Sequence, residues 1–175
     1  VMQHLPHARG QRCVEMLARI QPRPRSACLG PSSRASLMKP PDFDYVAPTS
    51  LDDALTALRS DNDAMVLAGG QSLIPLLAFR LAWPTLLVDL ARVDQLTGIV
   101  EHDDRIVIGS MTRQRQIERD AMIASRCPLL STCLGYVGHP QIRSRGTIGG
   151  SLAHADPAAE LPAVVLALDG KVRVV

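Results

Sequence analysis

Two short segments of this sequence combine glycines with hydroxyl side chains, a combination suited to binding phosphate. The first is Ala68-Gly69-Gly70-Gln71-Ser72, which follows a run of apolar residues. Glycines let the backbone approach a ligand closely and turn its N–H groups outward, and the hydroxyl of Ser72 adds a further donor. The segment matches neither the P-loop nor the Gly-x-Gly-x-x-Gly fingerprint. Taken alone, a diglycine after a strand is more often a structural turn than a binding site.

The second segment, Thr147-Ile148-Gly149-Gly150-Ser151, repeats this pattern in the second half of the chain. Two such segments in one small protein indicate that both contact a single extended ligand with several phosphates or hydroxyls. Asp156 and Glu160 follow closely and are candidate acceptors for ribose or ribityl hydroxyls, although Asp156 is equally suited to cap the next helix. Arg143 and Arg145 are candidates either for phosphate partners or for solvated surface residues.

The sequence shows no pattern for a metal centre or for nucleophilic catalysis. No second ligand stands at a useful spacing from His154, and Ser72 lacks the nucleophile-elbow context. None of the cysteines forms a CxxC pair; they are Cys13, Cys28, Cys127 and Cys133. A zinc ribbon, an iron–sulfur site in this chain and a disulfide scaffold are therefore poorly supported, which favours a reducing, cytoplasmic setting. Cys127 and Cys133 are expected to be small buried apolar residues.

Composition and charge exclude several function classes. The 175 residues are 46% apolar and 21% charged, which is typical of a globular protein, and no apolar run approaches the roughly 20 residues of a membrane helix. Residues 1–37 hold six arginines and one glutamate, a net charge of +5. Residues 38–175 hold 13 basic and 16 acidic residues, a net charge of −3, so the body lacks the basic excess of a nucleic-acid-binding protein. The leader, 1–37, is expected to be disordered: a transit-like peptide, an unstructured extension or sequence outside the natural protein.

Helix and strand signals alternate along the body, which predicts an α+β protein with two lobes, 38–95 and 96–175. Ser50 has the character of a helix cap, and the glycine-rich stretch 146–156 is expected to be a loop. Further helices are predicted at 73–81, 112–119, 128–137 and 157–168, and strands at 64–68, 86–90, 105–109 and 171–175. The last strand requires a neighbour, either an upstream strand or sequence beyond this chain.

At the two glycine segments the sequence resembles the FAD-binding medium subunits of molybdenum hydroxylases, such as the medium chain of carbon monoxide dehydrogenase and the FAD subunits of xanthine dehydrogenase-type enzymes. Ala68 to Ser72 with Leu73-Ile74-Pro75 resembles the first flavin-binding motif of that family. Thr147 to Ser151 with Ala155-Asp156-Pro157-Ala158-Ala159-Glu160 resembles the second. The opening Lys39-Pro40-Pro41-Asp42-Phe43-Asp44-Tyr45 is also similar, so the resemblance covers Met38 to Val175.

The resemblance implies a p-cresol methylhydroxylase-type fold. A small α/β lobe (38–95) would be followed by a lobe with a mostly antiparallel sheet (96–175), with FAD between them. Ala68 to Ser72 would hold the pyrophosphate, and Thr147 to Ser151 would contact the flavin side and the linking phosphates. Glu160 stands where relatives commonly have an aspartate facing the cofactor. By the same resemblance, the C-terminal subdomain of such subunits is expected to be absent from this sequence.

The implied function is electron transfer. FAD would pass electrons from the [2Fe-2S] clusters of a small subunit to an acceptor such as NAD or a quinone, after a large subunit with molybdopterin has oxidised the substrate. No catalytic acid–base pair and no metal ligand are expected in this chain. Two alternatives remain at this point: a stand-alone FAD oxidoreductase of the same fold, and a non-catalytic module that binds nucleotide phosphates.

Overall fold

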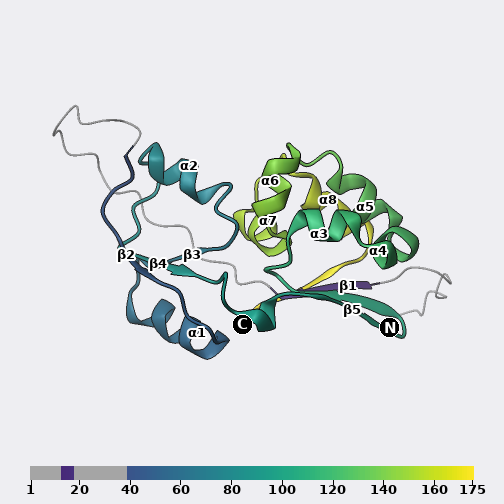
Figure 1. Cartoon of the computed structure of the whole chain (residues 1–175), viewed down its shortest axis with the longest axis horizontal. Coiled ribbons are helices and arrows are strands. Elements are labelled where there is room, and N and C mark those ends of the chain that lie inside the picture. The colour runs from purple at the N-terminus through teal and green to yellow at the C-terminus, as the bar shows by residue number, and fades with distance from the viewer. Residues whose placement is uncertain (1–12, 18–38) are drawn as a thin grey trace, which may run out of the picture.

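The computed structural model of the chain describes residues 39–175 and the backbone of residues 13–17 (Figure 1). The helices and strands form two lobes, each with its own sheet. The smaller sheet has the strand order β2-β4-β3, and the larger sheet has the order β5-β6-β1-β7. Together with the helices these sheets make an α+β protein, as the sequence predicts.

The small lobe is a parallel sheet between two helices. Its strands are β2 (Asp44–Val46), β3 (Met65–Leu67) and β4 (Leu86–Asp89). They run parallel because α1 (Leu51–Ser60) and α2 (Leu73–Ala78) each return the chain to the starting end of the sheet. Figure 1 shows these two helices on opposite faces of the sheet. The first glycine segment begins with Ala68, directly after the end of β3.

Helix α1 begins as the sequence predicts. The Oγ of Ser50 accepts a hydrogen bond of 3.1 Å from the N–H of Asp53, which satisfies one of the free donors of the first turn. Helix α2 ends in a Schellman motif. Arg80 has φ = 54° and donates its N–H to the carbonyl of Leu77, while the N–H of Leu81 reaches the carbonyl of Leu76. This turn leads the chain back towards β4.

The larger sheet contains a hairpin and two further strands. Strands β5 (Ile99–His102) and β6 (Arg105–Ile108) pair antiparallel. Strand β1 (Cys13–Leu17) lies between β6 and β7 (Lys171–Arg173) and runs parallel to both. The expectation of a mostly antiparallel sheet in this lobe is therefore wrong, because β1 separates the hairpin from β7 and makes two of the three strand pairs parallel. The last strand of the sequence thus has a neighbour within the chain.

The expectation of a disordered leader differs from the structure at five residues, Cys13–Leu17, which form β1. The facing edges of β6 and β7 present unpaired backbone groups, and an extended segment between them satisfies both rows. The other residues of the 1–37 segment lie outside the described part of the chain, and for them the expectation stays a prediction.

The helices of the second lobe lie together on one side of the larger sheet (Figure 1). They are α3 (Gln114–Arg119), α4 (Ala121–Arg126), α5 (Pro128–Leu134), α6 (Pro140–Arg145), α7 (Ile148–His154) and α8 (Glu160–Ala167). A short 3₁₀ turn, η1 (Asp94–Leu96), connects the lobes. The main core lies under these helices and is built from aliphatic side chains, with Ile108, Ile117 and Leu134 fully buried.

Several helix boundaries differ from the prediction. Thr112 does not cap α3, because its hydroxyl bonds to the backbone N–H and carbonyl of Gly98 instead, at 2.9 and 3.0 Å. Pro128 begins α5 as predicted. The final helix begins at Glu160 rather than at Pro157, because Asp156 accepts the N–H of Ala158 and forms a separate turn. Such local side-chain bonds compete with helical ones.

Cys127 and Cys133 are free and buried, as expected, and burial raises the pKa of both thiols.

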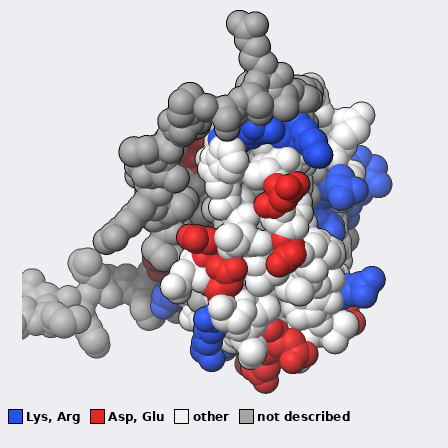
Figure 2. All heavy atoms as spheres, turned by 90° about the vertical axis from the view of Figure 1, so that its left-hand side faces the viewer, with Lys and Arg blue, Asp and Glu red and all other residues white. Residues whose placement is uncertain are grey.

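Figure 2 shows the end of the molecule that carries the small lobe, where acidic and basic side chains are interspersed with uncharged surface. No helix in residues 39–175 is long and apolar enough to span a bilayer.

Candidate functional site

A cavity of about 570 Å³ is lined by residues of both lobes. It includes both glycine segments, which are therefore brought together as the sequence predicts. The small lobe contributes the end of β3, the first segment and part of α2. The second lobe contributes some of its residues between Ser110 and His154. The residues of the two segments that line the cavity are Ala68, Gly69, Gly70, Gln71, Ser72, Thr147, Gly149, Gly150 and Ser151.

The first segment presents free backbone donors. Within the described part of the chain, no hydrogen bond uses the N–H groups of Gly69, Gly70, Gln71 or Ser72. The loop is closed instead through its other atoms, since the carbonyl of Gly70 accepts the N–H of Ile74 at 3.2 Å, and the Gln71 amide bonds to the carbonyl of Gly69. Successive free N–H groups of this kind attract anions.

Both glycines of this segment are required by the backbone. Gly70 has φ = +73°, a conformation that other residues adopt only at a cost. Gly69 packs against the backbone of the second lobe. A Cβ on Gly69 would lie 2.8 Å from the Cα of Gly146 and would also overlap the carbonyl of Arg145. The two lobes therefore meet here through main-chain atoms.

The second segment is not a loop, contrary to the prediction for 146–156. Its residues form the start of helix α7, and the Thr147 side chain caps that helix by accepting the N–H of Gly150 at 3.0 Å. Glycine disfavours helix, but packing overrides this preference here. A Cβ on Gly149 would lie 2.5 Å from the Cβ of Ser110, so only glycine allows α7 to approach that residue.

The N–H groups at the start of α7 are already used. Ile148 donates to the carbonyl of Thr112 at 3.2 Å, Gly149 to that of Ser110 at 2.8 Å, and Ser151 to that of Thr147 at 3.2 Å. The second segment therefore differs from the first, because its backbone is bound within the protein. The hydroxyls of Ser72 and Ser151 make no hydrogen bond in the described structure, so both remain available to a ligand.

The remaining candidate residues lie in different surroundings. Ile148 is fully buried in the main core. Asp156 and Glu160 are exposed and are not among the residues that line the cavity. The carbonyl of Arg145 accepts a hydrogen bond from the Arg113 guanidinium.

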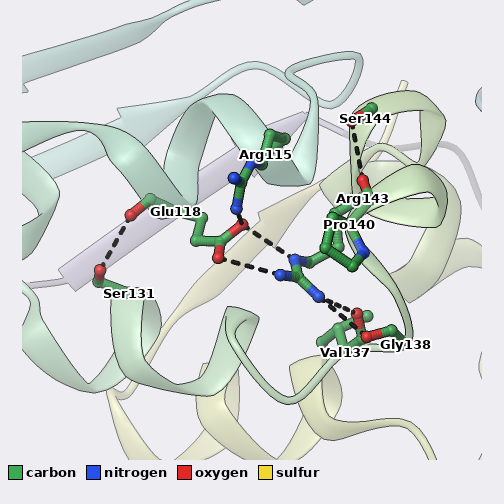
Figure 3. Close-up of polar contacts among 8 residues, drawn as sticks. All are labelled: Arg115, Glu118, Ser131, Val137, Gly138, Pro140, Arg143 and Ser144. Carbon is green, nitrogen blue, oxygen red and sulfur yellow. Dashed lines mark hydrogen bonds and ion pairs between the residues drawn. The ribbon is translucent and has the colours of Figure 1, made fainter.

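Arg143 is neither a surface residue nor positioned at the glycine segments. It is buried, and its guanidinium forms an ion pair with Glu118 in which the Nε–Oε2 distance is 2.9 Å (Figure 3). Arg143 and, more weakly, Arg115 hold the pKa of Glu118 below its usual range, against the opposing effect of burial. The sequence does not reveal this pair, because the two residues are on different helices.

Sequence reasoning also missed Gln114, which lines the cavity beside Gly146. Gln114 is 4% exposed, and its side-chain Oε1 has no hydrogen-bond partner among the described residues. Buried polar atoms are normally paired, so an unpaired acceptor at a cavity is a feature typical of a ligand site. A lone glutamine in a polar stretch of sequence carries no signal of this kind.

The site fits an elongated nucleotide. Its volume is within the usual range for cofactor pockets, and its lining is mainly apolar with a few polar groups. Free N–H groups and two serine hydroxyls suit a pyrophosphate, and apolar residues such as Leu73, Leu76 and Val137 suit a ring system. His154 is at the cavity too, but residues 39–175 contain no group of three potential ligands for a metal ion.

Known proteins are similar to this chain in sequence and in fold. Residues 41–175 match the family model described as the FAD binding domain in molybdopterin dehydrogenase. The chain is 53% identical over 136 residues to the 6-hydroxypseudooxynicotine dehydrogenase complex subunit alpha of Paenarthrobacter nicotinovorans, which covers 77% of this chain and 46% of that subunit. It is 40% identical over 133 residues to the carbon monoxide dehydrogenase medium chain of Hydrogenophaga pseudoflava, with 75% and 46% covered.

Solved structures agree with these matches. The carbon monoxide dehydrogenase of Hydrogenophaga pseudoflava that lacks the Mo-pyranopterin moiety superposes with a TM-score of 0.71 and 41% identity, covering 73% of this chain and 45% of that chain. Quinoline 2-oxidoreductase from Pseudomonas putida 86 gives a TM-score of 0.70 and 46% identity, covering 71% and 44%. The chain thus spans less than half the length of the relatives it matches. Because the family model covers most of the sequence and the fold agrees, the chain belongs to the FAD-binding domain family of molybdopterin dehydrogenases.

Proposed function

We propose that this chain binds FAD in the cavity between its lobes and is the flavin-binding part of a molybdenum-containing hydroxylase or dehydrogenase. The observation that carries the proposal is the row of free N–H groups at Gly69 to Ser72, in a cavity whose other wall is the second glycine segment. Membership of the family supports the choice of FAD over other nucleotides.

The two segments would have different roles. The loop from Gly69 to Ser72 would hold the pyrophosphate through its N–H groups, with the hydroxyls of Ser72 and Ser151 as further donors. Thr147 would act by capping α7 with its side chain, and Gly149 would hold α7 in place by donating its N–H to the carbonyl of Ser110. When bound, FAD supplies the redox chemistry, and this chain binds it, orients it and shields it from water.

In the complete complex we expect this chain to transfer electrons. The iron–sulfur clusters of a small subunit would be the source and an external acceptor such as NAD or a quinone the destination, with molybdopterin on a large subunit. The names of the relatives support this, since they include a medium chain of carbon monoxide dehydrogenase and a subunit of a dehydrogenase complex. The cytoplasmic location expected from the cysteine pattern stays a prediction.

The proposal is tested by titrating the chain with FAD, FMN and riboflavin. Trp83, the only tryptophan, follows the cavity residues Leu81 and Ala82, so its fluorescence can report binding. Because the free N–H groups address phosphates, FAD should bind at least about tenfold more tightly than riboflavin. Equal affinity for the two ligands would contradict the assigned role of the first segment, and no FAD binding would contradict the proposal.

A pair of serine variants makes this test specific. Ser72→Ala removes a hydroxyl at the cavity, and we expect it to weaken FAD binding by about tenfold while leaving riboflavin binding unchanged. Ser60→Ala removes a hydroxyl at the end of α1, where it bonds to the carbonyl of Ala57, and should leave both affinities unchanged. A loss of FAD affinity in both variants would show that the effect does not arise at the cavity.

A further inference from the structure

Arg143 joins three parts of the second lobe. It extends from α6 and is 5% exposed. Towards α3 it makes a two-point ion pair with Glu118, with its Nε 2.9 Å from Oε2 and its Nη2 3.1 Å from Oε1. Figure 3 shows the guanidinium between this carboxylate and the turn that follows α5.

The same guanidinium holds that turn. Its Nη1 donates to the carbonyl of Val137 at 3.0 Å and to that of Gly138 at 2.9 Å. Within residues 39–175, no other donor reaches either of these carbonyl oxygens. Gly138 has φ = +49°, so the turn reverses sharply at this point. The position of the turn therefore depends on Arg143, whose own orientation depends on Glu118.

This turn and helix α6 form part of the cavity wall. Val137, whose carbonyl Arg143 contacts, and Ile142, which precedes Arg143 in α6, both line the cavity. Helix α6 then leads to Gly146, against which Gly69 of the first segment packs. A displacement of the turn or of α6 would thus move the wall and the junction between the lobes.

We propose that Arg143, fixed by Glu118, is a positioning residue that sets the cavity wall at Val137 and Ile142 and so controls the affinity of the chain for its flavin nucleotide. The inference rests on the proposed function. Arginine suits this role because its planar fork presents donors in two directions, and four of its five donors are used here. A lysine has three donors on a single nitrogen, so it cannot reproduce the two-point contact with the carboxylate together with the contacts to both carbonyls.

The test compares Arg143→Lys and Glu118→Gln with the unaltered chain. Each is titrated with FAD, the visible circular dichroism of the bound flavin is recorded, and unfolding by urea is measured separately. We expect Arg143→Lys to lose at least about tenfold in FAD affinity with a changed dichroism spectrum. Glu118→Gln should lose less, because an amide oxygen still accepts a hydrogen bond from Arg143.

Arg126→Lys is the matched control. Arg126 at the end of α4 pairs with Glu101 on β5, and neither residue lines the cavity. This variant should keep the FAD affinity and the dichroism spectrum even where its stability falls. Unchanged FAD affinity and dichroism in folded Arg143→Lys and Glu118→Gln would overturn the inference, as would equal losses in Arg126→Lys. Failure of the unaltered chain to bind FAD would instead count against the proposed function.

Discussion

At the scale of single residues, Gly149 shows packing in conflict with helix propensity. It occupies the first turn of α7, where alanine would be favoured by about 1 kcal/mol on propensity alone. A Cβ on Gly149 would lie 2.5 Å from the Cβ of Ser110 and 2.6 Å from its carbonyl oxygen. The carbonyl belongs to the backbone, so it cannot move away without displacing the chain. We therefore predict that Gly149→Ala lowers the free energy of unfolding by about 3 kcal/mol, measured by urea denaturation.

Gly135→Ala provides the control for that measurement. Gly135 follows α5 with ordinary helical angles, and a Cβ there would have a single close neighbour, the carbonyl of Thr132 at 3.2 Å. The free energy of unfolding of the Gly135→Ala variant should differ from that of the unaltered chain by less than about 1 kcal/mol. A Gly149→Ala protein as stable as the unaltered chain would show that α7 can move away from Ser110.

Glu118 predicts a dependence of stability on pH. Because Arg143 and Arg115 hold the pKa of Glu118 below its ordinary value of 4.5, the folded chain binds this proton less readily than the unfolded chain. The stabilisation is therefore complete above that ordinary value and is lost as the pH falls through the lowered pKa. Glu118→Gln should be less stable than the unaltered chain at pH 7, and the difference should shrink below pH 4.5.

Urea midpoints measured from pH 7 to pH 3 check this expectation. Asp104→Asn is a suitable comparison, since Asp104 is 83% exposed and lies 3.9 Å from its basic neighbour. It should change the midpoints little at any pH. A constant difference between Glu118→Gln and the unaltered chain across this range would mean that the carboxylate charge contributes no stability.

Residue types alone could identify the first glycine segment but not the partners of Arg143. The pattern Gly69-Gly70-Gln71-Ser72 carries its chemistry locally, because a tight turn and free N–H groups follow from the glycines themselves. The positions of Arg143 and Gln114 can be understood only from residues that are distant in sequence. Arg143 pairs with Glu118, and Gln114 lies beside Gly146. No local pattern records such contacts.

At the scale of secondary structure, the ends of helices explain most of the agreement and the disagreement. Ser50 and Pro128 were sufficient to place the starts of α1 and α5, because capping and proline geometry act within one turn. Helix α7 was missed because its two glycines resemble a loop, whereas in the structure Gly149 packs against Ser110 and the Thr147 side chain caps the helix. The prediction for α7 therefore failed where a tertiary contact opposed local preference, whereas the start of α8 was misplaced because of the local hydrogen bond of Asp156.

The end of α2 offers a test at this scale. Arg80 adopts φ = 54° in the Schellman motif, a conformation that costs a residue with a Cβ roughly 1 kcal/mol. Arg80→Gly should therefore raise the free energy of unfolding by about 1 kcal/mol, measured by urea denaturation. Arg80→Ala is the control, since it also removes the contact of the guanidinium with the carbonyl of Lys39 but keeps the strain. If both variants are equally stable, the left-handed turn is not under strain.

At the scale of the whole molecule, the chain contains both glycine segments but spans less than half the length of its relatives. We predict that a longer version, continued beyond Val175 with the sequence of such a relative, retains FAD through gel filtration better than this chain does. Additional protein around the cavity would exclude water from the bound nucleotide and slow its release. Equal retention by both versions would show that the two lobes suffice to hold the cofactor.

The main-chain contact between Gly69 and Gly146 has a kinetic consequence. No side chain separates the lobes at this point, so there is no rotamer whose rotation could let one lobe slide past the other. A cavity held in this way is already shaped before the nucleotide arrives, and association needs no slow conformational step. The observed binding rate should then rise linearly with nucleotide concentration, without a plateau, and sequence changes around the cavity should alter chiefly how long the nucleotide stays.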